Sequence, residues 1–318
     1  MTPTGATPLR AADPLQVHPA FHAGRDAVVI AAPAKLNLCL EILRKRSDNY
    51  HDLESLMVAI DLFDTLEIRA TANDQIALTC EPDGLSTGPD NLVHKAATAL
   101  RLFAVRPDLG ASIKLTKRIP TQAGLGGGSS DAAAALVGLN QIWKLGLTRD
   151  ELVDIAASLG SDVAFFLSLP AAWCTGRGEV TTPELVEDEC PGLYFVLVFP
   201  PVGVSTADVY KRLAVPEKPF AGFAVRAAFR VGDATALGAA MFNRLEEPAF
   251  EIEPLVGRMR QRLGQLNPAG AMMSGSGSTV FAPCRDPHEA NRVASAFRDS
   301  RPTDEPESRV LVVHGFTP

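Results

Sequence analysis

The sequence predicts a two-lobed α+β protein, and three observations support this prediction. The chain has 318 residues, whereas domains usually hold roughly 100 to 200. Strand-like and helix-like segments are mixed along most of its length. The apolar run that ends at Phe199 is stopped by Pro200-Pro201. We therefore expect a first lobe over residues 27–199 and a second lobe over residues 200–318.

The first lobe is expected to begin with a sheet and to continue with helices that pack together. Alternating or β-branched apolar runs predict strands, and apolar residues at helical spacing predict helices. Thr148 and Glu151 form a capping box that would start the last of these helices. The predicted strands span residues 28–30, 36–43, 64–69, 111–117, 174–180 and 193–199. The predicted helices span residues 91–103, 129–144 and 148–159.

In the second lobe, helix-like stretches alternate with short strands, as an α+β lobe requires. The predicted helices span residues 234–245, 253–266 and 287–300, and the predicted strands span residues 279–282 and 309–314.

The composition is that of an ordinary soluble globular protein. Apolar residues make up 46% and charged residues 21% of the chain, which indicates neither disorder nor a membrane span. The net charge is −7 and no dense Lys/Arg run is present, so the protein lacks the basic surface that binds a nucleic-acid backbone. We expect no nucleic-acid partner and no membrane association.

The cysteines and histidines do not indicate disulfides or a transition-metal site. The five cysteines are odd in number and widely scattered, and the six histidines form no ligand motif. We interpret the cysteines as reduced thiols of a cytoplasmic protein. Residues 1–26 are rich in Pro, Thr and Ala and lack the apolar core of a signal peptide, so we expect a disordered leader there.

A glycine-rich segment, Ala123-Gly-Leu-Gly-Gly-Gly-Ser-Ser130, precedes an alanine-rich helical pattern. Consecutive glycines permit close backbone approaches, and the unpaired N–H groups of a helix start attract an anion, most often phosphate. The segment lacks the Gly-Lys-Ser/Thr ending of a P-loop and the context of a dinucleotide fingerprint. It predicts a phosphate site of another class, although a flexible connector before a core helix would show the same glycines.

This segment and its flanks resemble the ATP loop of the GHMP kinase superfamily, which includes galactokinase, homoserine kinase and mevalonate kinase. Pro33-Ala-Lys-Leu-Asn-Leu-Cys-Leu40 is similar to the first motif of that family, and Gly270-Ala-Met-Met-Ser-Gly-Ser-Gly-Ser278 to its third, in the family's order. The resemblance implies an N-terminal ribosomal-protein-S5-like lobe, a C-terminal ferredoxin-like lobe and an active site in the cleft between them. It also implies that ATP is bound by Ala123, Gly124, Leu125, Gly126, Gly127, Gly128, Ser129 and Ser130.

Three further segments resemble the branch of this superfamily that phosphorylates 4-diphosphocytidyl-2-C-methyl-D-erythritol in non-mevalonate isoprenoid synthesis. They are Arg46-Ser-Asp-Asn-Tyr-His-Asp-Leu-Glu-Ser55, Gly160-Ser-Asp-Val-Ala-Phe-Phe166 and Gly176-Arg-Gly-Glu179. Asn49 stands where the pattern usually has Gly, and Ala164 where it has Pro. Asn tolerates a positive φ better than other non-glycine residues, so Asn49 suits the same turn.

The resemblance places Asp162 as the base that takes the proton of the substrate alcohol, and Lys35 as the cation that orients it. Taken alone, Asp162 would more simply cap a helix and Lys35 would extend from an exposed strand face. Asn37 lies two residues along the same strand and should share the face of Lys35, either as a substrate contact or as a structural amide. The third motif would contribute substrate contacts from Ser274, Gly275, Ser276 and Gly277.

Recognition of the cytidine is implied for Tyr50 and His51, with Tyr210 as an opposing ring. An aromatic ring can stack on a base while an imidazole hydrogen-bonds its edge, and each stacked ring is worth about 1 to 3 kcal/mol. Ordinary packing at a turn is the alternative for both tyrosines. Asn91 resembles a residue of the family's adenine pocket but would serve equally as a helix cap.

Mg²⁺ is expected to arrive with ATP, because the sequence shows no dedicated carboxylate cage and substrate phosphates and water would supply most ligands. A kinase of the homoserine or mevalonate type would lack Tyr50 and His51. A non-catalytic nucleotide-binding relative would have no need of Lys35 and Asp162. We expect a monomer or a homodimer.

Overall fold

The computed structural model describes residues 20–22, 27–186 and 192–315. Its strands are β1 (Ala20–His22), β2 (Ala27–Lys45), β3 (His51–Thr71), β4 (Ile76–Glu81), β5 (Gly110–Thr116), β6 (Ala171–Thr175), β7 (Val180–Pro183), β8 (Tyr194–Phe199), β9 (Phe242–Asn243), β10 (Met272–Met273), β11 (Val280–Cys284) and β12 (Arg309–His314). Its helices are α2 (Leu92–Phe103), α3 (Gly127–Ile142), α4 (Arg149–Leu159), the 3₁₀ turn η1 (Phe165–Leu167), α5 (Thr206–Arg212), α6 (Phe223–Arg230), α7 (Ala234–Ala240), α8 (Glu246–Ile252), α9 (Pro254–Gln265) and α10 (Pro287–Asp299).

The described strands form two sheets. The larger has eight strands in the order β1-β2-β3-β5-β4, with β6 and β9 paired to β3 and β2, and β7 paired to β6. The smaller has four strands in the order β10-β11-β8-β12. Helices accompany both sheets, which confirms the α+β class predicted from the sequence.

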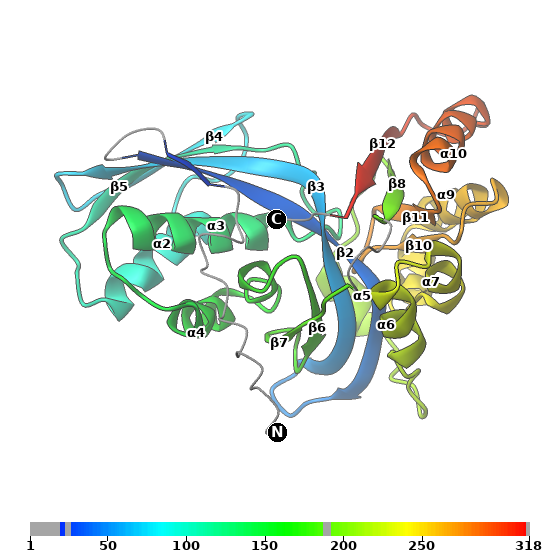
Figure 1. The fold of residues 1–318 in the computed structure, drawn as a ribbon, viewed down its shortest axis with the longest axis horizontal. Helices are drawn as coiled ribbons and strands as arrows, with labels where there is room; N and C mark the ends of the chain where they lie inside the picture. Colours follow the sequence, from blue (N-terminus) through cyan, green and yellow to red (C-terminus); the bar gives the residue numbers. More distant parts are fainter. Residues whose placement is uncertain (1–19, 23–26, 187–191, 316–318) are drawn as a thin grey trace, which may run out of the picture.

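The long antiparallel hairpin of β2 and β3 lies at the centre of the larger sheet (Figure 1). The sequence predicted two separate strands where β2 runs unbroken for 19 residues. Register shifts interrupt its pairing next to Pro33 and again after Asn37. A bulge accommodates a proline that a regular central strand would not, so the strand continues through Pro33.

Helices α2, α3 and α4 lie together on one face of the larger sheet (Figure 1). Helix α3 is buried on nearly all sides, and its alanines at positions 132–135 have no exposed surface. Such a helix is apolar all round because other elements surround it, and small side chains let its neighbours approach closely. The predicted helices at 91–103, 129–144 and 148–159 are confirmed, with the capping box of Thr148 and Glu151 in place.

The C-terminal helices lie beside the smaller sheet, and α7, α9 and α10 contact it directly. Strand β8 pairs with both β11 and β12, although the sequence placed it at the end of the first lobe. Because hydrogen bonding joins β8 to the C-terminal strands, the lobe division that we propose falls before Tyr194 rather than at Pro200. A shared apolar cluster from β2, β3, β8 and β11 joins the two sheets.

Other sequence predictions differ locally from the structure. Residues 174–180 were predicted as one strand but form the end of β6, a turn at 176–179 and the start of β7, because glycines at 176 and 178 adopt positive φ there. The sequence did not predict β4, η1, α5, α6, α8 or β10, each of eight residues or fewer. The helix predicted at 234–245 ends at Ala240 as α7, and β9 lies within the rest of that range. The predicted leader at 1–26 lies outside the described residues except at β1, which pairs with β2.

None of the helices in the described part of the chain has the length and apolar character needed to cross a bilayer. The four cysteines within the described ranges are buried free thiols, as predicted for them, and Cys190 lies outside those ranges.

Candidate active site

A cavity of about 1040 Å³ lies against both β2 and the C-terminal elements. The predicted site residues that line it are Lys35, Asn37, Tyr50, His51, Asn91, residues 123–129, Asp162, Tyr210, Gly275, Ser276 and Gly277. Ser130 and Ser274 do not line it, because both are buried beneath its wall. The structure therefore gathers nearly all of the residues singled out from the sequence around one space.

Lys35 stands at the centre of the cavity wall. Its side chain is only 3% exposed, so the alternative of an exposed lysine on a strand face does not hold. Its Nζ lies 3.9 Å from Oδ2 of Asp162 and donates 2.7 Å to the carbonyl oxygen of Gly124. Burial lowers the pKa of the Lys35 ammonium below its usual value, and the charge of Asp162 opposes that shift.

Asp162 lies in the turn after α4, just before η1. No side chain caps η1, whose N-cap residue is Ala164, so the helix-cap alternative for Asp162 is not observed. The carboxylate is 34% exposed and faces the cavity. Ala164 has a φ of −62°, which is also the φ of proline, and this explains how the position accepts either residue.

Asn37 shares the face of Lys35, as the alternation along the strand predicted. Its Oδ1 accepts a hydrogen bond from Lys35 Nζ, and its Nδ2 donates 2.8 Å to Oγ of Ser55 on β3. The Ser55 hydroxyl in turn donates 2.6 Å to the carbonyl of Cys39. This buried chain fixes the amide orientation so that an oxygen, not a nitrogen, meets the ammonium.

The glycine loop ends in the N-terminus of α3, as predicted. Gly126 is its N-cap residue in the left-handed conformation, and the first helical bond runs from Ser130 N to Gly126 O at 2.9 Å. The N–H groups of residues 127–129 precede that bond, so helix geometry leaves them without helical acceptors. They line the cavity and form an anion site of the kind that binds phosphate.

The third motif braces the glycine loop from the other side. Gly124 has a φ of 74°, and a Cβ there would lie 2.0 Å from the carbonyl oxygen of Ser274. The Ser274 hydroxyl donates 2.9 Å to Gly124 O, and Thr279 N donates 3.2 Å to Ala123 O. A Cβ on Gly275 would come within 3.2 Å of Lys35 Nζ. Three motifs far apart in the sequence thus meet at one ammonium group.

A buried charge cluster supports the loop from below. Lys117 Nζ donates to Asp64 and, at 2.7 Å, to Oδ2 of Asp131, the fifth residue of α3. Asp64 also accepts backbone N–H bonds from residues 118 and 119, whereas Oδ1 of Asp131 has no partner among the described residues. Burial, only partly offset by Lys117, raises the pKa of Asp131 to about 7. Two carboxylates share this one ammonium, and the negative charge of Asp64 adds to the effect of burial on Asp131.

At the other end of the cavity, aromatic and cationic side chains gather near the β2–β3 turn. The rings of His51 and Tyr210 lie 5.3 Å apart, and the Arg177 guanidinium lies 5.0 Å from the ring centroid of Tyr50. Asn49 has a φ of 67°, which confirms that it holds a turn suited to glycine. Burial and then the charge of Lys45 lower the pKa of His51, which favours the neutral ring that can both donate and accept a hydrogen bond.

Asn91 is the N-cap of α2, where its Oδ1 accepts 2.9 Å from Val93 N. The capping alternative is therefore observed, although the residue also lines the cavity. Sequence reasoning assigned no role to Arg177, Lys117, Asp131 or Asn243, whose Nδ2 donates 2.8 Å and 2.7 Å to the carbonyls of Met273 and Gly275. The first three lay within the quoted motifs or their flanks. Nothing in the sequence near Asn243 indicates its contact with a loop thirty residues away.

Two family models match the chain. The model of the GHMP kinases N terminal domain matches residues 91–168, and that of the GHMP kinases C terminal region matches residues 225–302. The chain is 43% identical over 295 residues to a 4-diphosphocytidyl-2-C-methyl-D-erythritol kinase of Pelotomaculum thermopropionicum, covering 92% of this chain and 99% of that protein. It is 40% identical over 271 residues to a kinase of the same name from Shouchella clausii, covering 85% and 90%.

Solved structures agree with these sequence relatives. A 4-(cytidine 5'-diphospho)-2C-methyl-D-erythritol kinase superposes with a TM-score of 0.74 at 33% identity, covering 91% of this chain and 100% of that one. A homoserine kinase from Cytophaga hutchinsonii superposes with a TM-score of 0.71 at 20% identity, covering 92% and 96%, which is a likeness of fold alone.

Proposed function

The chain belongs to the GHMP kinase family of 4-diphosphocytidyl-2-C-methyl-D-erythritol kinases, and from that premise we propose how its own residues carry out the reaction. The enzyme transfers the γ-phosphoryl group of ATP to the 2-hydroxyl of 4-diphosphocytidyl-2-C-methyl-D-erythritol, which gives the 2-phosphate and ADP. The observation that carries the residue roles is the convergence of Lys35, Gly124 and Gly275 on one side of the cavity, with Asp162 beside them.

The phosphates of ATP bind at the N-terminus of α3. The N–H groups of residues 127–129 and the positive end of the helix dipole face the cavity there, and both favour negative charge. Ser130 and Ser274 support the loop without touching ATP. Ser130 is buried in the first turn of α3, and the Ser274 hydroxyl donates its hydrogen bond to the Gly124 carbonyl. Asn91 caps α2 beside the cavity and borders the adenine.

Lys35 and Asp162 act on the acceptor alcohol. Phosphoryl transfer depends chiefly on alignment and on stabilising charge, so a base and a cation at the acceptor are sufficient. The 2-hydroxyl oxygen attacks the γ-phosphorus, its proton passes to the carboxylate of Asp162, and ADP leaves. Lys35 is held by Asn37 and Gly124 O, so its ammonium is already oriented when the oxygen develops negative charge.

Mg²⁺ bound together with ATP would supply positive charge near the phosphates, and Asp131 is the residue that would offer it an oxygen. Within the described residues, His, Cys, Asp and Glu do not gather in a group of three or more that could hold a metal ion. The oxygen that would bind the ion is Oδ1 of Asp131. This atom is buried and has no partner among the described residues, and Asp131 lines the cavity. One hard oxygen donor suits an ion that keeps most of its phosphate and water ligands.

The cytidine binds at the opposite end of the cavity. Tyr50 supplies a stacking face, His51 a neutral imidazole for the base edge, and Tyr210 a ring beside His51. Ser276 and Gly277 border the acceptor, with the Ser276 hydroxyl held 2.7 Å from that of Thr206 on α5. A cytoplasmic location and a monomeric or homodimeric state complete the proposal, the former because the described cysteines are unpaired thiols.

A substrate panel tests the function. The purified chain is mixed with ATP, Mg²⁺ and one acceptor at a time, and ADP formation is measured in a coupled assay. We expect ADP with 4-diphosphocytidyl-2-C-methyl-D-erythritol and none above background with homoserine or mevalonate. Turnover of the simpler alcohols at an equal kcat/KM would refute the cytidine recognition proposed for Tyr50 and His51.

A further inference from the structure

The turn at residues 176–179, between β6 and β7, touches both ends of the cavity. Its Gly176 carbonyl accepts a 2.7 Å hydrogen bond from Leu53 N, two residues after His51 on β3. At its other side, a Cβ on Gly178 would lie 3.8 Å from Oδ1 of Asp162. The turn therefore spans the distance between the proposed cytidine and acceptor positions, and Arg177 is at its tip.

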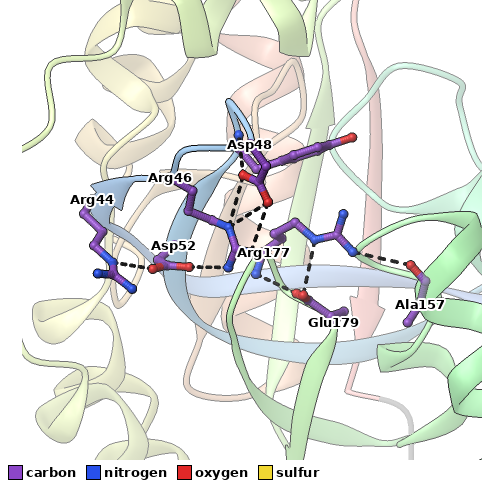
Figure 2. A network of polar contacts seen from close by, with 8 residues as sticks. Arg44, Arg46, Asp48, Asp52, Ala157, Arg177 and Glu179 are labelled. Atoms are coloured by element: carbon purple, nitrogen blue, oxygen red, sulfur yellow. Dashed lines mark hydrogen bonds and ion pairs between the residues drawn. The ribbon is translucent and has the colours of Figure 1, made fainter.

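Arg177 is held in place from within the turn. Its backbone N–H donates 2.6 Å to Oε2 of Glu179, and its Nε donates 3.2 Å to Oε1 of the same carboxylate. The terminal nitrogens are less engaged, since Nη2 makes only a 3.5 Å contact with the carbonyl of Ala157 and no described residue accepts from Nη1 (Figure 2). The guanidinium is thus held in one orientation, while its Nη1 and Nη2 groups can still donate hydrogen bonds. The residue lines the cavity.

The substrate places a charged group in this region. With its cytosine on Tyr50 and its alcohol at Asp162, the diphosphate between them must pass the turn that carries Arg177. Two negatively charged phosphates need donors there, and guanidinium binds phosphate oxygens through paired N–H groups.

The other cations that line the cavity are placed or paired differently. Lys35 forms an ion pair with Asp162, and Lys117 lies between two buried carboxylates. Lys211 pairs with Asp208 at 2.9 Å. Lys45 lies opposite His51 at the end of β2, on the cytidine side. Arg177 is the cation whose turn contacts both Tyr50 and the neighbourhood of Asp162.

We propose that Arg177 is a substrate-binding residue that grips the diphosphate through Nη1 and Nη2, while Glu179 fixes its orientation. The inference rests on the proposed function, because it requires cytidine at Tyr50. It adds a determinant of specificity that distinguishes a cytidine diphosphate ester from an uncharged cytidine compound.

Binding of CDP and of cytidine to the full chain tests this role, with Arg177→Met as the variant. Methionine keeps an apolar stem of similar length but no charge. We expect the affinity for CDP to fall about 10- to 100-fold, the loss of charged hydrogen bonds. The affinity for cytidine should fall less than about fivefold, because it loses only the support that Arg177 gives the Tyr50 ring. Isothermal titration calorimetry measures both.

Arg44→Met is the matched control. Arg44 belongs to the neighbouring ion-pair network and pairs with Asp52 at 2.5 Å, but it is exposed and does not line the cavity (Figure 2). Its removal should leave both affinities at the wild-type value. Arg177→Lys keeps the charge without the fork and should bind CDP with intermediate affinity, which provides a second variant if the methionine substitution prevents folding.

The outcomes distinguish the role of Arg177 from the kinase function. An equal loss of affinity for CDP and cytidine, or no loss for either, would overturn the diphosphate role of Arg177 and leave the kinase assignment untouched. A wild-type chain that bound neither CDP nor cytidine would instead refute the proposed cytidine site itself.

Discussion

The two ends of the cavity are built in different ways. The proposed phosphate end comprises the glycine loop at 123–130, Lys35 and the loop at 274–277; Lys35 and the loop at 274–277 are buried, the glycine loop is mostly buried or half-buried, and hydrogen bonds to the Gly124 carbonyl tie the three together. The proposed cytidine end, formed by Tyr50, His51, Arg177 and Tyr210, uses side chains on turns, on the first residue of β3 and on the short helix α5, and Tyr50 is 53% exposed. The proposed chemistry thus lies at the more buried end of the cavity, and the proposed recognition lies at the more open end.

This difference follows from what each end must do. A cation that stabilises developing charge acts best when it is preorganised and shielded from water. A remote pocket needs surface and stacking area, and its binding energy is expressed largely in KM unless it helps to align the reacting groups. Substitutions at the phosphate end should therefore change rate or folding, and substitutions at the cytidine end should change affinity.

The largest effect is expected from Asp162→Asn. Asparagine keeps the shape but cannot take the proton of the acceptor alcohol, so kcat should fall about 10²- to 10⁴-fold. Steady-state kinetics with saturating ATP measure it. Asp154→Asn, on the exposed face of α4 and away from the cavity, is the control and should keep the wild-type kcat. A wild-type kcat in Asp162→Asn would remove this carboxylate from the mechanism.

Gly124→Ala should destabilise the packing of the glycine loop against the loop at 274–277. The added Cβ would lie 2.0 Å from a backbone oxygen of the opposing loop, which cannot yield as a side chain would. We expect a loss of about 3 kcal/mol in the free energy of unfolding, measured with urea, together with weaker ATP binding.

Gly146→Ala is the matched control for that clash. Gly146 has a φ of 68°, close to the 74° of Gly124, but its Cβ would meet nothing within 4 Å. Its cost should be limited to the backbone strain of about 1 kcal/mol. Equal losses in the two variants would show that φ alone matters and that the two loops are not tightly packed.

Tyr50→Ala tests the cytidine end. Removal of the stacking face should raise KM for 4-diphosphocytidyl-2-C-methyl-D-erythritol about 5- to 150-fold, with kcat near the wild-type value. Tyr50→Phe retains the ring and should keep most of the affinity. If the alanine variant lost kcat instead, the ring would contribute to alignment of the reacting groups and the separation of the two ends would fail.

A prediction of a different kind concerns Asp131 and pH. Its folded pKa of about 7 lies above the ordinary value of a free aspartate, near 3.9, so the folded state binds this proton more tightly than the unfolded state. Stability from this group is present at low pH and is lost as pH rises from about 4 to 7, by at most about 1.4 kcal/mol per pH unit.

Urea unfolding of the wild type and of Asp131→Asn at pH 5, 6, 7 and 8 measures this dependence. The stability difference, wild type minus variant, should decline from pH 5 to 7 and then level off. A constant difference would show that Asp131 is ionised throughout this range, and a difference that rose with pH would likewise contradict a raised pKa.

The sequence predicted the phosphate end more completely than the cytidine end. Glycines before an alanine-rich helix carry a physical signal, and the alternation along one strand placed Asn37 beside Lys35 as the structure has it. Helices with periodic apolar faces, such as α2 and α10, were found close to their bounds. These features depend on local order in the chain.

What the sequence did not predict depends on contacts between distant segments. The role of β8 in the smaller sheet follows from its partners β11 and β12, which lie about 80 to 120 residues further along the chain. The pairing of Lys117 with Asp64 and the contact of Arg177 with Tyr50 likewise join segments more than 50 residues apart. Short helices such as α8 have too few residues to show a period.

The most direct test of the division between the two ends measures rate and affinity separately in the same proteins. Single-turnover phosphorylation at saturating substrate gives the rate, and calorimetric titration of 4-diphosphocytidyl-2-C-methyl-D-erythritol gives Kd, for the wild type, Asp162→Asn and Tyr50→Ala. We expect Asp162→Asn to lose the rate and keep the affinity, and Tyr50→Ala to lose the affinity and keep the rate. Loss of both rate and affinity in both variants would contradict the division of roles between the two ends of the cavity.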